Sequence, residues 1–181
     1  MKFFIVGCAK TGTWLLTRLF FAFPEIKKIL TGGEVHIGHL AESDYNLCKR
    51  SYNSIFSNTF EISKINRDKK VMENNEDINI IYITRNKKDV LQSSGGYVTE
   101  KRYDDCEKQR KKYNDLINFE IKFENIISQP DVEQKRLADK FGLKIDHKWS
   151  KYPDFVPQYV FEYSFLKKRK NYRPRRLGEK I

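Results

Sequence analysis

The sequence predicts an α/β fold, with a central, mostly parallel β-sheet as the middle of three layers. A continuous apolar run, FFIVG, lies in the strand-like segment at residues 2–7, and a mostly β-branched and aromatic run, INIIYIT, lies at residues 78–84; apolar runs of this length are typical of parallel strands that are covered on both faces. Segments with helical spacing of apolar residues alternate with the strand-like runs. The chain has 181 residues, 39% of them hydrophobic, so we expect residues 1–181 to form a single domain with its own core.

The first half of the chain is expected to begin with a strand, a glycine-bearing loop and a helix. The strand covers residues 2–7, and the helix covers residues 13–23 and stops at Pro24. A second extended segment is predicted around residues 35–40, because it follows a glycine pair that favours a turn. Residues 42–60 have a helix-permissive composition, although several Asn and Ser residues oppose it.

The second half continues the alternation. The run INIIYIT at residues 78–84 is rich in β-branched and aromatic residues and predicts a strand. A helix is expected over residues 87–94, ended by Gly95, and another over residues 104–118. A further strand is expected at residues 119–124.

The last predicted helix has clear signals at both ends. It covers residues 131–141, with Pro130 at its start and Gly142 just after its end. Beyond it the chain is aromatic and proline-bearing, and residues 167–181 are strongly basic. This tail is either a functional segment or a solvated, disordered end.

Charge and cysteine content narrow the choice of partner and compartment. The formal net charge of +11 favours a phosphate-bearing or polyanionic ligand, and the alternative is a solubilising surface of lysines. Three cysteines without a CxxC pair indicate neither a metal cluster nor a disulfide framework, so we expect a cytoplasmic location. Polar residues such as Lys10 and Arg18 interrupt the apolar N-terminus, so we expect neither a signal peptide nor a membrane partner.

The segment GCAKTGTW at residues 7–14 resembles a phosphate-binding loop. It lies between the first strand and the first helix, where backbone amides and the helix dipole favour an anion. The glycine spacing is that of the ATP-binding P-loop, but Thr13 replaces its lysine, Trp14 replaces the hydroxyl residue that binds Mg²⁺, and a lysine stands at Lys10 instead. This pattern makes Mg·ATP chemistry less expected than binding of a less charged phosphosulfate. An ordinary strand-to-helix turn is the structural alternative.

Two blocks of the sequence resemble the sulfotransferases that use 3′-phosphoadenosine 5′-phosphosulfate (PAPS). The loop of that family reads approximately PKSGTTW, and here Lys10 to Thr13 match it. A second family block resembles YxxRNPKDVxxS, and this chain has IYITRNKKDVLQS, which places Arg85 and Ser93 at the same separation. The chemistry agrees, because an arginine grips a phosphate with two hydrogen bonds and a serine adds a hydroxyl donor.

The resemblance implies a P-loop NTPase-like sulfotransferase fold, PAPS as the donor, its product PAP, and no metal. Lys10 is the expected catalytic lysine at the departing phosphate oxygen, and Arg85 with Ser93 is expected to bind the 3′-phosphate. The residues expected to contact the rest of the 5′ end of the cofactor are Thr11, Gly12, Thr13 and Trp14.

Weaker family blocks imply further cofactor contacts. The segment IKFENIISQP looks like the family's VRYEDLxxDP, which puts Phe123 at the position of an adenine-contacting tyrosine. Arg173 and Arg175 lie where the family has its RKGxxGD loop, although Pro174 departs from that pattern. The resemblance therefore implies that residues 167–181 include a mobile cofactor-binding loop.

Transfer of a sulfuryl group to an alcohol needs a base, and the family places a histidine in a segment like KTHLP. HIGHLAE offers His36 and His39, and we predict His39 as the catalytic base because Leu40 follows it. His147 lies outside the matching blocks and is read as a surface residue.

Two other function classes stay open on the sequence. A P-loop kinase of small molecules would need a metal ligand that Trp14 does not supply. A non-catalytic binder of nucleic acid or anionic polysaccharide could use the basic tail, although we do not expect a nucleic-acid partner. The expected acceptor is a small-molecule or saccharide hydroxyl. Because the chain is short for the family, its pocket is either open or completed in a homodimer.

Overall fold

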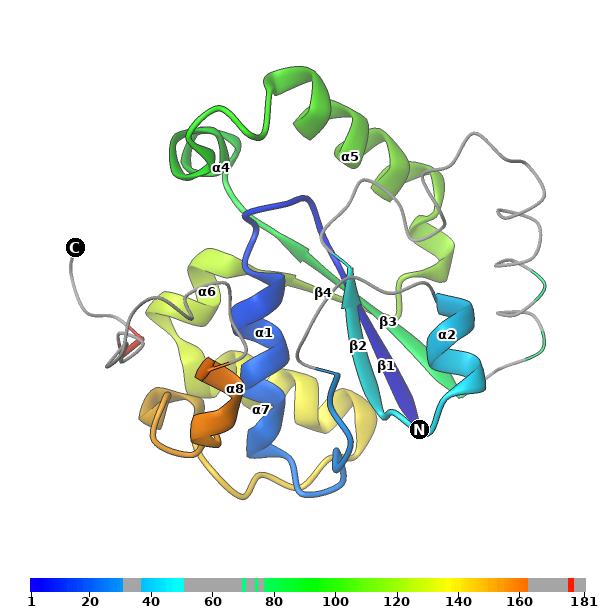
Figure 1. The fold of residues 1–181 in the computed structure, drawn as a ribbon, viewed down its shortest axis with the longest axis vertical. Helices are drawn as coiled ribbons and strands as arrows, with labels where there is room; N and C mark the ends of the chain where they lie inside the picture. Colours follow the sequence, from blue (N-terminus) through cyan, green and yellow to red (C-terminus); the bar gives the residue numbers. More distant parts are fainter. Residues whose placement is uncertain (31–36, 51–69, 71–73, 75–76, 163–175, 178–181) are drawn as a thin grey trace.

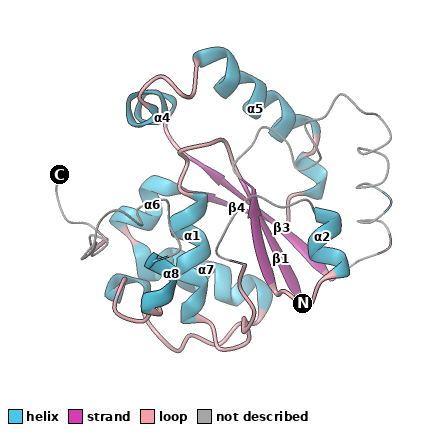
Figure 2. Ribbon diagram, in the orientation of Figure 1, coloured by secondary structure: helices cyan, strands magenta, loops and turns pink. Residues whose placement is uncertain are grey.

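The computed structural model describes residues 1–30, 37–50, 70, 74, 77–162 and 176–177. Within them the chain forms a four-stranded sheet in the order β2-β1-β3-β4, drawn in magenta in Figure 2. All of the strand pairs are parallel, which confirms the predicted α/β class. The strands are β1 (Lys2–Val6), β2 (Leu47–Arg50), β3 (Ile78–Thr84) and β4 (Phe119–Lys122).

Helices cover both faces of the sheet, because alternate strand side chains point to opposite sides. Phe3, Ile5 and Ile81 face a large buried cluster together with residues of α1 (Thr13–Leu19), α6 (Phe123–Ser128) and α7 (Pro130–Phe141). Phe4, Val6 and Ile80 face a second cluster with residues of α2 (Ile37–Glu42). The two helix layers are visible on either side of the strands in Figure 1, which confirms the predicted three layers.

Most of the predicted helices and strands form, with small changes at their ends. The strand at residues 78–84 and the helix at residues 87–94 are β3 and α4 (Lys87–Ser94), and Gly95 ends α4 in the left-handed conformation. The next helix, α5 (Glu100–Lys112), starts four residues before the predicted residue 104, and a short 3-10 helix (Asn114–Leu116) follows it.

The segments after β4 and α1 are divided differently from the prediction. The strand expected at residues 119–124 ends at Lys122, because Phe123 already begins α6. The first helix also ends earlier than expected, and a 3-10 helix (Phe20–Ala22) completes it. Another 3-10 helix (Trp149–Lys151) and α8 (Gln158–Glu162) follow α7.

Two predictions for the segment between α1 and β3 were wrong. Residues 37–40, expected to be extended, begin α2, because Ile37, Leu40 and Ala41 share one helical face that packs on the sheet. Residues 47–50, expected to be helical, form β2 beside β1. Residues 35–36 and 51–60 of these two predictions lie outside the described residues. Among the described helices, none has the length and apolar character needed to cross a membrane.

Candidate active site

The carboxyl ends of β1 and β3 meet at the point where the sheet changes winding direction. From β1 the chain continues to β2 on one side, whereas from β3 it continues to β4 on the other side. In open parallel sheets, ligands bind in the crevice outside the carboxyl ends of strands at such a switch point. The predicted loop at residues 7–14 follows β1, and Arg85 follows β3. The topology therefore brings the two predicted anion-binding segments to one place.

The loop comes very close to the neighbouring elements at its two glycines. A Cβ at Gly7 would lie 2.7 Å from the carbonyl oxygen of Ile83 in β3, and a Cβ at Gly12 would lie 2.4 Å from the Phe123 ring. Gly12 also has φ +103, in the left-handed region that favours glycine. Both glycines are thus required by the close approach of the loop to β3 and α6.

The centre of the loop is a tight turn that exposes Lys10. The carbonyl oxygen of Cys8 accepts hydrogen bonds from the amide of Thr11 at 3.2 Å and from its hydroxyl at 2.7 Å. Lys10 has φ 71, which is uncommon for a residue other than glycine. Thr11 is buried with both of its donors directed into the turn, whereas Lys10 is exposed. The side chain offered to a ligand is therefore that of Lys10.

Arg85 connects the loop to α4. Its Nη1 donates to the backbone carbonyl of Lys10 at 3.0 Å and to Ser93 Oγ at a long 3.5 Å. Ser93 Oγ itself donates to the carbonyl of Val90 at 3.2 Å. The structure thus brings Lys10, Arg85 and Ser93 together.

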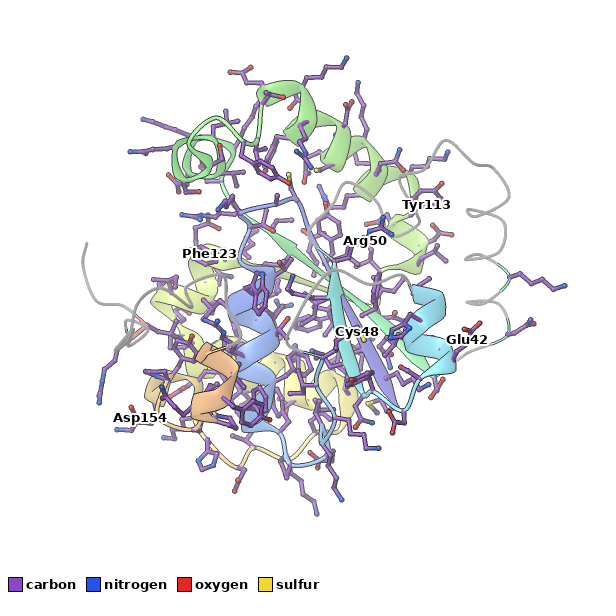
Figure 3. All side chains as sticks on the ribbon, viewed as in Figure 1. Glu42, Cys48, Arg50, Tyr113, Phe123 and Asp154 are labelled. Carbon is purple, nitrogen blue, oxygen red and sulfur yellow. The ribbon has the colours of Figure 1, made fainter. Side chains whose placement is uncertain are left out.

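Phe123 contacts both Arg85 and the loop at residues 7–14. The guanidinium carbon of Arg85 lies 4.4 Å from the centre of the Phe123 ring, and the same ring packs against Gly12. Figure 3 labels Phe123 beside the amino-terminal end of α1. Arg85 Nε is buried and has no hydrogen-bond partner among the described residues. Such an unsatisfied donor is costly unless a ligand or water pairs with it.

Groups on α4, α5 and α6 hold the backbone around Arg85. The hydroxyl of Tyr103 donates to the carbonyl of Arg85 at 2.8 Å, and burial raises the pKa of Tyr103 to about 12, so this phenol remains a donor at neutral pH. The amide of Asn86 donates to Glu124 Oε1 at 2.8 Å. Asn86 Oδ1 accepts from the amide of Lys88 and caps α4. The position of Arg85 is therefore fixed from three helices.

A cavity of about 310 Å³ opens beside the loop. Its lining combines cations with aromatic rings, as a site for a phosphate attached to a ring system would require. The lining residues are Lys10, Gly12, Thr13, Trp14, Leu15, Arg18 and Tyr152. Four of the predicted 5′-end residues, Lys10 and Gly12 to Trp14, thus share one cavity, and Thr11 does not line it.

Lys49 is a candidate that the sequence analysis missed. It lies in β2 opposite Ile5, is 1% exposed, and places its Nζ 4.4 Å from the centre of the Trp14 ring. Arg50 follows it, also buried, at the carboxyl end of the same strand. The buried Lys49 thus lies against the first residue pair of α1, next to the phosphate-type loop. Its only sequence signal is the pair KR directly after the apolar pair LC, which is equally the pattern of a solvated strand end.

His39 lies elsewhere. Its ring is 6.4 Å from that of Tyr45, which precedes β2, and the next two residues of α2 accept hydrogen bonds from Lys2 Nζ through their backbone carbonyls. Lys2 begins β1, and the strand rises about 13 Å before the loop starts. The N-terminus lies beside α2 in Figure 1. The structure therefore places His39 at the amino edge of the sheet and does not bring it to Lys10.

The other predicted residues lie outside the described chain or away from the loop. Arg173, Arg175 and His36 belong to segments that the structure does not describe. His147 stacks on Phe155 with ring centres 5.6 Å apart.

No family model matches the chain, and no curated protein matches it. The candidate site is therefore inferred from the positions of its residues alone.

Proposed function

We propose that this chain is a PAPS-dependent sulfotransferase that transfers the sulfuryl group to an acceptor hydroxyl. One observation carries the proposal: the hydrogen bond of 3.0 Å between Arg85 Nη1 and the Lys10 carbonyl. It joins two groups suited to bind phosphates, which follow adjacent parallel strands at the switch point of the sheet. A nucleotide with a phosphate at each end of its ribose is a ligand that both groups could hold at once.

In this proposal Arg85 and Ser93 hold the 3′-phosphate. Arg85 Nε is buried and without a partner among the described residues, so a bound oxyanion would satisfy a donor that is otherwise lost. The Phe123 ring 4.4 Å away keeps the guanidinium in place. The Ser93 hydroxyl at the end of α4 donates to the Val90 carbonyl in this structure, and in this proposal it turns to the phosphate when the nucleotide binds.

Lys10 acts at the opposite end of the nucleotide. The acceptor oxygen attacks the sulfur in line, the bond between sulfur and the bridging oxygen breaks, and negative charge develops on the departing phosphate. The exposed ammonium of Lys10 stabilises this charge, and buried Lys49 adds positive potential from β2. The cavity beside Trp14 accommodates the ring system of the nucleotide.

The proposal leaves the base unassigned. The hydroxyl proton of the acceptor has to be removed within hydrogen-bond reach of the reacting oxygen. His39 lies at the amino edge of the sheet, beside Tyr45, so its predicted role depends on a rearrangement that the described residues give no reason to invoke.

Calorimetric titration with PAP and with Mg·ATP tests the donor assignment. We expect PAP to bind and Mg·ATP to bind at least about tenfold more weakly, because Trp14 stands where a kinase has its metal-binding hydroxyl. Tight binding of Mg·ATP with no response to PAP would make the chain a P-loop kinase. Transfer from labelled PAPS to a panel of sugar and phenol hydroxyls then tests the reaction, with Lys10→Ala expected to lose turnover.

Arg136 offers a matched control for Arg85. It also lies over a phenylalanine ring, with its guanidinium carbon 4.2 Å from the centre of Phe119, and it donates to the carbonyl of Glu120 at 2.8 Å. Arg136→Ala thus removes the same kind of stacking and backbone bond on α7, together with an ion pair to the buried Glu133, so it should destabilise the fold at least as much as Arg85→Ala. Only Arg85→Ala should weaken PAP binding. Equal weakening in both variants would mean that Arg85 acts through stability alone.

A further inference from the structure

Two buried thiols lie directly behind the phosphate-type loop. Cys8 belongs to the loop, and Cys106 lies in the middle of α5. Both are members of one small buried cluster with Ala9, Val90 and Val98, and they are 2% and 0% exposed. Each thiol is also the largest influence on the pKa of the other, through a hydrogen bond between their side chains. The helix α5 is therefore packed, through this cluster, against the loop that follows β1.

The same helix also supports the second half of the site. Tyr103, three residues before Cys106 and on the same side of α5, donates to the carbonyl of Arg85 at 2.8 Å. The Cys8 carbonyl, in turn, accepts both hydrogen bonds that close the turn at Thr11. A change in the contact between Cys8 and Cys106 would therefore alter both the turn of the loop and the position of Arg85.

We propose that Cys8 and Cys106 are a redox pair, whose oxidation to a disulfide fixes the loop against α5 and weakens anion binding. The effect on binding rests on the proposed function, whereas formation of the disulfide does not. A peroxide or a small-molecule disulfide serves as the oxidant.

With hydrogen peroxide the chemistry balances as follows. The Cys8 thiolate attacks one peroxide oxygen, the O–O bond breaks, and hydroxide leaves, so that Cys8 becomes a sulfenic acid. The Cys106 thiol then attacks the Cys8 sulfur, the S–O bond breaks, and water leaves as the Cys106 proton is transferred. The hydroxide takes up the proton that the Cys8 thiol released on forming the thiolate, so the two sulfurs lose two electrons and one peroxide is reduced to two waters.

The surroundings of the thiols favour Cys8 as the attacking group. The hydrogen bond from Cys106 lowers the pKa of Cys8 against the opposing effect of burial, and the charge of Arg102 lowers it further. The hydrogen bond to Cys8 raises the pKa of Cys106, as does burial. Cys48 lies in another buried cluster, where burial raises its pKa to about 12, so it is the control thiol.

A disulfide changes the loop because it requires a closer approach than the thiol pair has. The sulfurs of a disulfide are about 2.05 Å apart, well inside the contact distance of two thiols. Cys8 is next to the turn, so its carbonyl moves with it and shifts the amide and hydroxyl of Thr11. Linkage then requires that a bound anion oppose oxidation, because each event changes the free energy of the other.

The test oxidises the folded, full-length protein with stoichiometric hydrogen peroxide at pH 7.5. Peptide mapping by mass spectrometry is expected to find a peptide joining Cys8 to Cys106, and dithiothreitol is expected to reverse it. Amide hydrogen exchange should slow in the loop at residues 8–13. The dissociation constant for PAP should rise at least about fivefold, the low end of coupling between linked sites, and return on reduction.

Cys106→Ala and Cys48→Ala provide the matched comparison, because each removes one buried thiol. Oxidation should leave PAP affinity unchanged in Cys106→Ala and still lower it in Cys48→Ala. The proposal is overturned if the native protein forms no link between Cys8 and Cys106, or if the link forms without changing loop exchange. A third outcome separates the two proposals. If oxidation links the thiols and slows exchange in the loop, but the reduced protein does not bind PAP, the proposed function is wrong and the redox pair stands.

Discussion

Substitution of Gly12 tests two features of the loop, its left-handed backbone conformation and its close packing against Phe123. A Cβ there would meet the Phe123 ring at 2.4 Å, and the residue has φ +103. Gly12→Ala is expected to lower the free energy of unfolding by about 1–3 kcal/mol from backbone strain, with a further loss from the clash. Thermal or denaturant unfolding measures the total.

Gly142 supplies the control for this substitution. It also has a positive φ of +66, but nothing lies within 4 Å of its Cβ position. Gly142→Ala should therefore show the backbone loss alone, and adding Phe123→Ala to Gly12→Ala should relieve part of the larger loss. Equal losses at the two glycines would contradict the close contact between the loop and α6.

His39 is the residue for which the sequence and the structure predict different results. The sequence pattern predicts that His39→Ala abolishes turnover, whereas its place beside Tyr45 at the amino edge of the sheet predicts that turnover and PAP affinity persist. Rates with labelled PAPS and a responsive acceptor, alongside Lys10→Ala, decide between them. A loss of turnover as large as that of Lys10→Ala, with PAP affinity intact, would restore His39 as the base.

The sequence located the cluster of Lys10, Arg85 and Ser93 better than its surroundings. Lys10, Arg85 and Ser93 could be found because each stands at a fixed place relative to a well-marked strand or helix. Lys49 could not, because a lysine after two apolar residues is more commonly a solvated strand end. Only its pairing with Ile5 and its contact with Trp14 reveal that it is buried beside the loop.

The start of α4 is the element that sets the position of Arg85. Asn86 caps it by accepting from the amide of Lys88 at 2.9 Å. Asn86→Ala should lower the free energy of unfolding by about 1 kcal/mol, as measured by denaturant titration. It should also weaken PAP binding, because Asn86 directly follows Arg85 and its capping hydrogen bond holds the backbone that positions Arg85.

Thr99 provides a second cap for comparison, because its side chain accepts from the amide of Arg102 at the start of α5. Thr99→Ala should cost a similar amount of stability and weaken PAP binding less than Asn86→Ala does, because α5 holds Arg85 only through the hydrogen bond of Tyr103 to its carbonyl. If both caps affected affinity equally, the link between α4 and the anion site would be refuted.

Among the elements, those with marked ends were predictable and the short ones were not. Pro130 and Gly142 delimit α7, and β-branched residues mark β3, so both form where expected. The six residues of α2 and the four of β2 are too short for periodicity to separate helix from strand. For them the sheet decides: β2 forms because it extends β1, and α2 forms because its apolar face covers the sheet.

At the scale of the whole molecule, the strand order creates the site. Arg85 is 75 residues from Lys10 in sequence, yet the pairing of β1 with β3 makes them hydrogen-bonded neighbours. The sequence predicted the parallel class of the sheet. It could not supply the order β2-β1-β3-β4, because order depends on which faces and edges the helices leave open.

The proposed function requires one nucleotide that bridges Lys10 and Arg85. The most direct test measures the affinities of PAP, 5′-AMP and 3′-AMP for the native protein, Arg85→Ala and Lys10→Ala. We predict that removing the 3′-phosphate costs the native protein about 10- to 150-fold in affinity, the value of a charged hydrogen bond, and costs Arg85→Ala almost nothing. Lys10→Ala should lose the preference for the 5′-phosphate in the same way. If 5′-AMP and PAP bind the native protein equally, Arg85 does not bind a 3′-phosphate, and the proposed bridging nucleotide is ruled out.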